Sequence, residues 1–224
     1  MKKTLLAVLL GSFAFASFAQ PITIEKQGAF SAGGTVIEAK KTFDPYHPEP
    51  DAMTLHGDHA NVIYQIPVHA KNISLMFLHG AGQSMRTWQT TPDGREGFQS
   101  VFLRKGYPVY LIDQPRRGDA GRATVDGTIK ASPDEQFWFG QFRMGLWPKF
   151  YDNSAFASQK DLNSFWRQMT PNTGPYNDKV IADAVTDALK KSEGTVLVTH
   201  SQGCGPGWLI GTEAGNNLKG IIAF

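Results

Sequence analysis

One serine in this chain has the neighbours that nucleophilic catalysis requires. Ser201 follows the apolar and β-branched run of residues 195–199, and Gly203, Gly205 and Gly207 come directly after it. The run predicts a buried strand, and the glycines let that strand and the next helix approach closely, so that the serine hydroxyl stands above the sheet edge. Thr199 departs from the small residue that usually opens this pattern. We expect a nucleophile; the alternative is a turn serine that caps a helix.

A second segment has the composition of an oxyanion-binding loop. His79-Gly80-Ala81-Gly82 follows the buried run 73–78. Acyl transfer requires N–H donors aimed at the oxygen that becomes negative. The backbone N–H groups of Gln202 and Ala81 are the candidate donors, because the first follows the nucleophile and the second lies in the glycine-rich loop. His79 is expected to tie this loop by hydrogen bonds.

The base and the acid of such a site are not evident in the sequence. A serine hydroxyl needs a base, and a third group must hold that base. No histidine follows Ser201, His200 should point away from it at the turn, and Glu213 is the only acidic residue after it. In strand–serine–helix sites of this kind the order is serine, acid, histidine. We therefore expect both groups beyond Phe224 and an inactive, incomplete domain in the sequence printed here.

The surrounding elements alternate between strands and helices. The strands are expected to be apolar along their length, which favours a mostly parallel sheet covered by helices on both faces. An N-terminal hairpin is predicted from two β-branched runs separated by Ala32-Gly33-Gly34. The predicted strands are 22–25, 34–39, 60–68, 73–78, 107–113, 195–199 and 220–224, and the predicted helices are 98–103, 178–191 and one that begins at 202. The final strand would open just as the sequence stops.

Residues 119–177 interrupt this alternation. The segment is rich in phenylalanine, tyrosine and tryptophan, and it is too long for a simple connection in a compact domain. We interpret it as an inserted lid or cap, with ordinary core filling by a long loop as the alternative. It is called the insertion below.

The first residues predict a secretory signal peptide. Lys2 and Lys3 precede an uncharged apolar run, and Ser17 and Ala19 supply small residues before a cleavage site at Gln20. The run is short for a spanning helix. We expect residues 1–19 to be removed, residues 20–224 to form one domain, and the protein to be periplasmic or secreted without stable membrane association.

Composition excludes several classes of function. The formal net charge is +2 and no basic stripe is present, so nucleic acid is not an expected partner. Cys204 is the single cysteine and no zinc-helix pattern of histidines occurs, so neither a disulfide nor a metal site is expected. Cys204 should be a small buried apolar residue behind the turn.

Arg116 and Arg117 have two open roles: holding a substrate carboxylate, or pairing with Asp113 or Asp119.

In combination these segments resemble the α/β-hydrolase superfamily, and within it a branch of secreted bacterial carboxylesterases. The segments are Leu78–Gly82, Trp88 with Thr91–Gly97, Tyr110–Gly118 and His200–Gly203. The resemblance implies hydrolysis of a small-molecule ester through an acyl-enzyme on Ser201, without a cofactor. It also implies a glutamate just past Phe224 and a histidine further on. A non-catalytic binding protein on this fold and an acyltransferase are the alternatives.

Overall fold

A six-stranded sheet forms the centre of the protein. The computed structural model describes residues 21–156 and 158–224, so the expected signal peptide lies outside the described residues. The strand order is β1-β4-β6-β5-β9-β10, and β4 pairs antiparallel with both β1 and β6. The other neighbours are parallel, which confirms the mostly parallel sheet. The strands are β1 (Ile24–Ala32), β4 (Ala60–Pro67), β5 (Ser74–Leu78), β6 (Val109–Asp113), β9 (Thr195–Thr199) and β10 (Leu218–Ala223).

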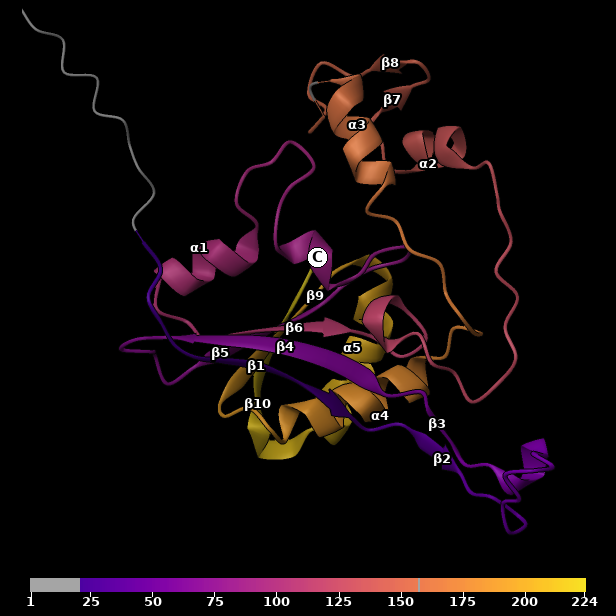
Figure 1. Ribbon diagram of the computed structural model, residues 1–224. Coiled ribbons are helices and arrows are strands. Elements are labelled where there is room, and N and C mark those ends of the chain that lie inside the picture. Colours follow the sequence, from indigo (N-terminus) through magenta and orange to yellow (C-terminus); the bar gives the residue numbers. More distant parts are fainter. Residues whose placement is uncertain (1–20, 157) are drawn as a thin grey trace, which may run out of the picture.

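Helices cover both faces of this sheet, as Figure 1 shows. On one face α1 (Phe98–Arg104) lies over β5 and β6, and its Leu103 packs against Leu75, Phe77 and Leu111. On the other face α4 (Asp178–Leu189) and α5 (Cys204–Glu213) cover Met76, Leu78 and Leu197. Alternate residues of one strand therefore enter opposite cores, which is why β5 and β6 are buried at every position.

Helix α4 shows how the sequence specifies one of these elements. Asn177 lies before it, and its side-chain oxygen accepts hydrogen bonds from the backbone N–H groups of Lys179 and Val180 at 3.0 and 3.1 Å. That cap satisfies two donors of the first turn. The apolar residues recur at helical spacing, and six of them are buried against the sheet: Ile181, Ala182, Ala184, Val185, Ala188 and Leu189. Burial of such a face, rather than helix propensity, stabilises the helix.

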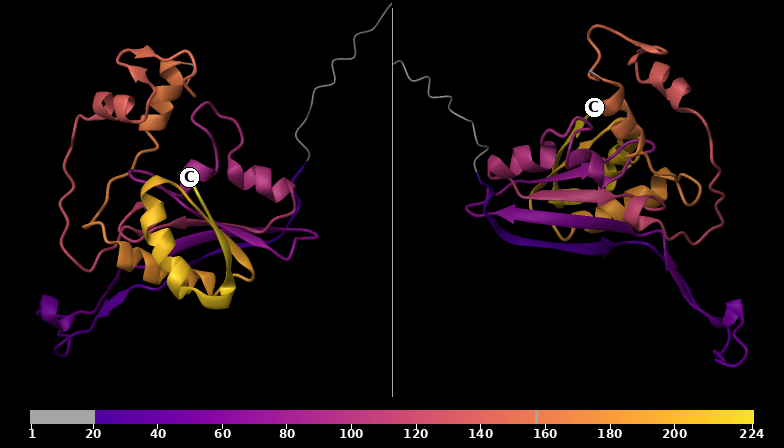
Figure 2. Two further views of the ribbon diagram at one scale, coloured as in Figure 1. Left: turned by 180° about the vertical axis from the view of Figure 1, so that it is seen from behind. Right: turned by 45° about the horizontal axis from the view of Figure 1, so that its top comes forward.

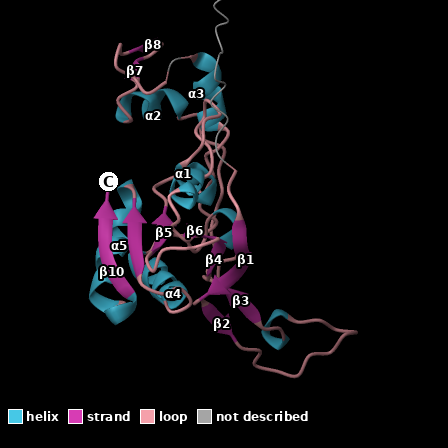
Figure 3. Ribbon diagram, turned by 90° about the vertical axis from the view of Figure 1, so that its left-hand side faces the viewer, coloured by secondary structure: helices cyan, strands magenta, loops and turns pink. Residues whose placement is uncertain are grey.

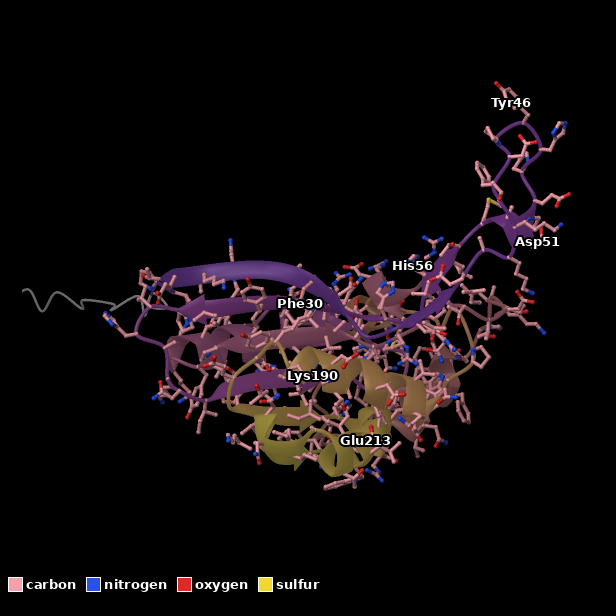
Figure 4. The ribbon with its side chains drawn as sticks, turned by 90° about the horizontal axis from the view of Figure 1, so that it is seen from below. Phe30, Tyr46, Asp51, His56, Lys190 and Glu213 are labelled. Carbon is pink, nitrogen blue, oxygen red and sulfur yellow. The ribbon has the colours of Figure 1, made fainter. Side chains whose placement is uncertain are left out.

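The expected N-terminal hairpin is wrong. β1 pairs with β4 along its length, whereas β2 (Thr35–Ile37) pairs with β3 (Leu55–Gly57) in a separate two-stranded arm. Gly33 and Gly34 have φ values of +62° and +102° and bend the chain out of the sheet instead of reversing it. A Cβ on Gly33 would lie 3.1 Å from Ala184 Cβ, so the bend is packed against α4. Figure 4 shows the arm leaving the body, with Tyr46 and Asp51 at its far end and Phe30 within the body.

The insertion forms a small unit of its own. It contains α2 (Glu135–Gln141), β7 (Gly145–Leu146), β8 (Lys149–Phe150) and α3 (Gln159–Trp166). Phe139, Met144 and Leu162 form a core that is separate from the two cores of the sheet. Figures 1 and 3 show this unit beyond the end of the sheet at which the parallel strands finish. None of the described helices is both long and apolar enough to cross a membrane.

Candidate active site

Ser201 lies at a tight turn between β9 and α5. Its φ is +53°, a left-handed conformation that a residue with a side chain seldom adopts. Residues 201–203 form one short 3-10 turn, and α5 follows at Cys204. A Cβ on Gly203 would lie 2.7 Å from the carbonyl oxygen of His79, so only glycine permits this approach. The turn leaves Ser201 exposed beyond the carboxyl end of β9.

The loop after β5 lies directly against this turn. A Cβ on Gly80 would lie 3.0 Å from Ser201 Cβ and 3.0 Å from His200 Nδ1, so a larger residue there would push the two segments apart. His79 is fully buried, and its ring contacts the Gly80 carbonyl at 3.1 Å and the Gln114 backbone N–H at 3.4 Å. These contacts are those expected of a residue that ties the loop.

Buried His79 is uncharged at neutral pH. Burial lowers its pKa to about 3, although Asp113 Oδ1 lies 3.7 Å from its Nε2 atom. Burial also raises the pKa of Asp113, which accepts backbone hydrogen bonds from Met85 at 2.6 Å and Asp119 at 2.8 Å. The His79–Asp113 contact is therefore not an ion pair at neutral pH, and both side chains serve to hold loops at the ends of β5 and β6.

The two candidate oxyanion donors lie on facing segments. Ala81 and Gln202 are both partly buried, and both border the same cavity. Neither backbone N–H donates a hydrogen bond to another group within residues 21–156 and 158–224. Fully buried N–H groups nearly always have an acceptor in the protein, whereas these two border the cavity, from which a bound molecule can accept their hydrogen bonds. The structure thus places two unpaired donors at the positions that the sequence indicated, while their role stays a prediction.

Arg117 connects three segments around these donors. It is 2% exposed. Its Nη1 donates to the Gly80 carbonyl at 2.8 Å, its Nε donates to Asn172 Oδ1 at 2.6 Å, and its Nη2 donates to Gln202 Oε1 at 3.2 Å and to Asn172 Oδ1. Burial lowers the pKa of Arg117 to about 10, so the guanidinium still carries its charge at neutral pH.

Of the two roles left open for the arginines, pairing with Asp113 or Asp119 is wrong. Arg116 instead pairs with Asp58, with Nε–Oδ1 and Nη2–Oδ2 distances of 2.7 and 2.9 Å. Arg116 has a φ of +66°, which turns consecutive arginine side chains toward different partners. The hydrogen bonds from Arg116 and Thr124 hold the pKa of Asp58 at about 2, against the opposing effect of burial.

A cavity of about 430 Å³ lies between the body and the insertion. The body contributes Ala81, Gly82, Arg117 and Gln202 to its wall, and the insertion contributes aromatic and apolar side chains on the opposite side. These are Trp138, Phe142, Trp166 and Met169. Charged and polar groups of the insertion also reach it, including Lys130, Asp134 and Glu135. A cavity of this size is suited to a small organic molecule with an apolar part.

No base for Ser201 is found in the described part of the chain. Neither a histidine nor a carboxylate of these residues forms a hydrogen bond with the Ser201 hydroxyl. The His200 ring lies at an angle of 88° to that of Trp88, with the ring centres 6.4 Å apart, and burial lowers its pKa. Glu213 lies at the last turn of α5 and contacts Lys179 at 3.6 Å. The carbonyl of Phe224 accepts a hydrogen bond from the Ser201 N–H at 2.8 Å, so β10 leads directly to this turn.

The remaining site predictions concern metals and Cys204. Within the described ranges no cluster of three or more histidine, cysteine or acidic side chains could bind a metal ion. Cys204 is only partly buried, which corrects the expected burial. Its Sγ accepts a hydrogen bond from Thr199 Oγ1 at 3.3 Å and contacts the Phe224 carbonyl at 3.5 Å, because it faces the space between β9 and β10.

Comparison with known proteins finds similar folds among hydrolases. A bacterial esterase of known structure superposes with a TM-score of 0.77 at 28% sequence identity, over 91% of this chain and 68% of the esterase. A probable secreted lipase from a fungus is 32% identical over 159 residues, which are 67% of this chain and 44% of the lipase. A peroxisomal α/β-hydrolase of Saccharomyces cerevisiae superposes with a TM-score of 0.43 at 14% identity, over 89% of this chain and 45% of that protein.

No protein-family model matches the sequence. The strand order, the helices on both faces and the similarity to the bacterial esterase nevertheless agree that the chain has the α/β-hydrolase fold. It spans less than half of the curated relative that it matches.

Sequence reasoning missed the contacts that hold the site together. The Arg116-Arg117 pair was noticed, but nothing in the sequence indicated that Asp58 and Asn172, each more than fifty positions away, would be the partners. Tyr176, whose hydroxyl donates to the Gln202 carbonyl at 3.2 Å, carried no signal either. Such partners are brought together only by the tertiary fold.

Proposed function

We propose that this chain contains the nucleophile and oxyanion hole of a secreted serine esterase. The observation that carries the proposal is the exposed Ser201 at a left-handed turn, next to two backbone N–H groups without acceptors. Acyl transfer needs a nucleophile and two N–H donors around the same ester carbonyl group, and these three groups meet that need. The esterase and lipase names of two similar proteins support this reaction class.

The proposed reaction proceeds through an acyl-enzyme. Ser201 Oγ attacks the ester carbonyl carbon while a base takes its proton, and the carbonyl oxygen becomes an oxyanion bound by the N–H groups of Ala81 and Gln202. Collapse of this intermediate expels the alcohol, which receives the proton from the base. Water then attacks the acyl group in the same way and releases the acid and free Ser201.

We infer that the base and its acidic partner follow Phe224 in the natural protein. The serine, acid, histidine order of this fold supports that position. The hydrogen bond between Ser201 N–H and the Phe224 carbonyl supports it too, because residues that follow β10 would start beside the nucleophile.

The insertion is proposed to act as a lid over an apolar substrate group. Its Trp138, Phe142 and Trp166 face Ala81 and Gln202 across the cavity. An aromatic wall of this kind binds an acyl or alcohol group of the ester by burying apolar surface, at roughly 25 cal/mol per Å². The lipase name of the fungal relative supports a secreted location and a substrate with such a group.

Replacement of the nucleophile tests the proposal. In the naturally produced protein, Ser201→Ala should lower ester hydrolysis by about 10⁴-fold or more, since the attacking atom is gone. A fluorophosphonate probe should add its mass to the Ser201 peptide of the parent protein alone. Ser100→Ala, on α1 away from the cavity, is the control and should retain full activity. Full activity in Ser201→Ala would disprove the serine mechanism. An apolar ligand bound by an unlabelled parent protein would favour a non-catalytic binding protein.

A further inference from the structure

The contacts of Arg117 bear on the geometry of the oxyanion hole. The guanidinium donates to the Gly80 carbonyl at 2.8 Å and to the Gln202 side chain at 3.2 Å. Gly80 and Gln202 are not close in sequence, and each belongs to one of the two segments that carry a candidate donor. One side chain thus contacts both segments.

The contact with Gly80 contributes to the orientation of the Ala81 N–H, together with the contacts of His79 and the Gln83 N–H with the same carbonyl. The carbonyl of residue 80 and the N–H of residue 81 belong to the same peptide group, which is planar and trans, so they point in opposite directions. When Arg117 holds the carbonyl on one side, the N–H must face the other side. A charged donor on the carbonyl also polarises the peptide and strengthens the bond that its N–H can make.

The contact with Gln202 acts on the second donor. Gln202 directly follows Ser201 in the left-handed turn, and its carbonyl lies 3.2 Å from the Tyr176 hydroxyl, which also contacts Asp178. Arg117 holds the end of the Gln202 side chain. The Gln202 N–H shares a peptide group with the Ser201 carbonyl, which accepts a hydrogen bond from the Cys204 N–H. That bond and the Arg117 contact with the side chain leave the N–H in a fixed direction.

The donors of Arg117 are already used within the protein. A guanidinium offers five N–H donors. The contacts with Gly80, Asn172 and Gln202 use four of them: the Nε hydrogen, both Nη2 hydrogens and one Nη1 hydrogen. A bidentate clamp on a substrate carboxylate would need two free donors. No carboxylate of the described residues forms a salt bridge with Arg117.

We propose that Arg117 is the positioning residue of the oxyanion hole, which holds the Gly80–Ala81 peptide and Gln202 so that both backbone N–H groups point at one site. The inference rests on the proposed esterase function. It assigns to Arg117 an effect on the transition state and not on substrate binding. The effect is expected in kcat, because the oxyanion exists only during the reaction.

The test compares Arg117→Met and Arg117→Lys with Arg116→Gln in the naturally produced protein. Loss of one oxyanion donor costs about 100- to 1,000-fold in kcat, and loss of its positioning should cost about 30- to 100-fold. We expect Arg117→Met to show this loss with KM changed by less than about threefold. Arg117→Lys should recover only a minor part, because an ammonium keeps the charge but cannot hold three acceptors in one plane.

Arg116→Gln is the matched control for a merely structural effect. It removes a buried guanidinium from the adjacent position and should lower the unfolding temperature at least as much, yet kcat of the folded protein should stay within about threefold of the parent. Equal kcat losses in the Arg116 and Arg117 variants would overturn the proposal. A rise of KM confined to esters that carry a carboxylate would also overturn it, in favour of a substrate clamp.

A structural measurement separates this inference from the proposed function. Hydrogen–deuterium exchange of the peptide that spans residues 79–83 should be faster in Arg117→Met than in the parent and unchanged in Arg116→Gln. Unchanged exchange in Arg117→Met would overturn the positioning role whatever the enzyme does. An inactive parent with the expected exchange pattern would contradict the esterase function and leave the role of Arg117 in holding the loop supported.

Discussion

At the scale of single residues, close contacts between backbones define the site. Glycines at positions 80 and 203 allow the loop after β5 to touch the turn at Ser201, because a Cβ at either position would meet atoms within 3.0 Å. The strain of the positive φ at Ser201 is maintained by this packing. The two glycines thus set how closely the loop and the turn approach each other.

Gly203→Ala should destabilise the protein by about 2 kcal/mol. The added methyl group would lie 2.7 Å from the His79 carbonyl and 3.1 Å from the Leu78 carbonyl, and neither backbone atom can move without disturbing β5. The control is Gly220→Ala in β10, where a Cβ has no neighbour within 4 Å. Urea unfolding of both variants measures the difference; equal stabilities would show that the turn relaxes around the methyl group.

The Asp58–Arg116 ion pair should make stability depend on pH in the acid range. The pKa of Asp58 is about 2 in the folded protein and near its ordinary value of 3.8 when unfolded, so ionisation favours the folded state. This contribution, about 2 kcal/mol, is present above pH 4 to 5 and is lost as the pH falls toward 2. The difference in unfolding free energy between the parent and Asp58→Asn should therefore narrow over that range. A difference that stays constant from pH 7 to pH 3 would contradict this assignment.

At the scale of elements, the insertion begins and ends at one place. Arg117 and Asn172 form an isolated antiparallel bridge, and a Cβ on Gly127 would lie 2.8 Å from Gly174 Cα. Residues 118–127 also pack on the body, where Thr124 hydrogen-bonds to Asp58 at 3.3 Å through its N–H. The separate unit, with its own core of Phe139, Met144 and Leu162, thus starts only after residue 127.

Removal of this unit should leave the body folded. We expect a variant in which residues 129–170 are replaced by a short Gly-Ser linker to keep its unfolding temperature within a few degrees, since the two sheet cores contain no residue of the unit. The KM for esters with a large apolar group should rise about tenfold as the aromatic wall is lost, whereas that for acetyl esters should change little. Steady-state kinetics on both substrate types measure this, and an equal rise for both would argue against the lid role.

The sequence predicted the individual strands and helices better than it predicted which strands pair and which side chains contact each other. The sequence located strands 73–78, 107–113 and 195–199 because they are continuous apolar runs. It located the helices at 98 and 178 because apolar residues recur at helical spacing and the ends carry glycine or a cap. The hairpin failed because Gly33 and Gly34 indicate a bend but not which strand comes next to the first. Ser201, Ala81 and Gln202 were located by local pattern, while Arg117 with Asn172 and Arg116 with Asp58 depend on contacts across more than fifty residues.

At the scale of the whole molecule, β10 forms one edge of the sheet, beside α5 (Figure 2, left). Ile222 and Phe224 are 45% and 67% exposed there. They border an apolar hollow whose wall includes Leu75, Phe77 and Val198. A sheet edge with apolar side chains is prone to pair with other chains.

A polypeptide of residues 21–224 alone should therefore self-associate. Ile222→Lys should reduce this association, because a charged side chain on an edge strand opposes strand pairing. Leu146→Lys is the control, since Leu146 is 72% exposed but lies in the insertion. Sedimentation at several protein concentrations measures the effect. A monomeric parent polypeptide, or equal effects of the two substitutions, would contradict the role of the β10 edge.

The bridge between Arg117 and Asn172 has a consequence for how this protein can diverge. If the insertion only selected the substrate, changes in its sequence would alter which ester is bound and would leave the rate of the chemical step unchanged. Here Asn172, at the end of the insertion, accepts hydrogen bonds from the guanidinium that also contacts Gly80 and Gln202. If that guanidinium holds the oxyanion hole, an exchange of insertions that shifts Asn172 would alter turnover together with selectivity. Selection acting on one property would then change the other.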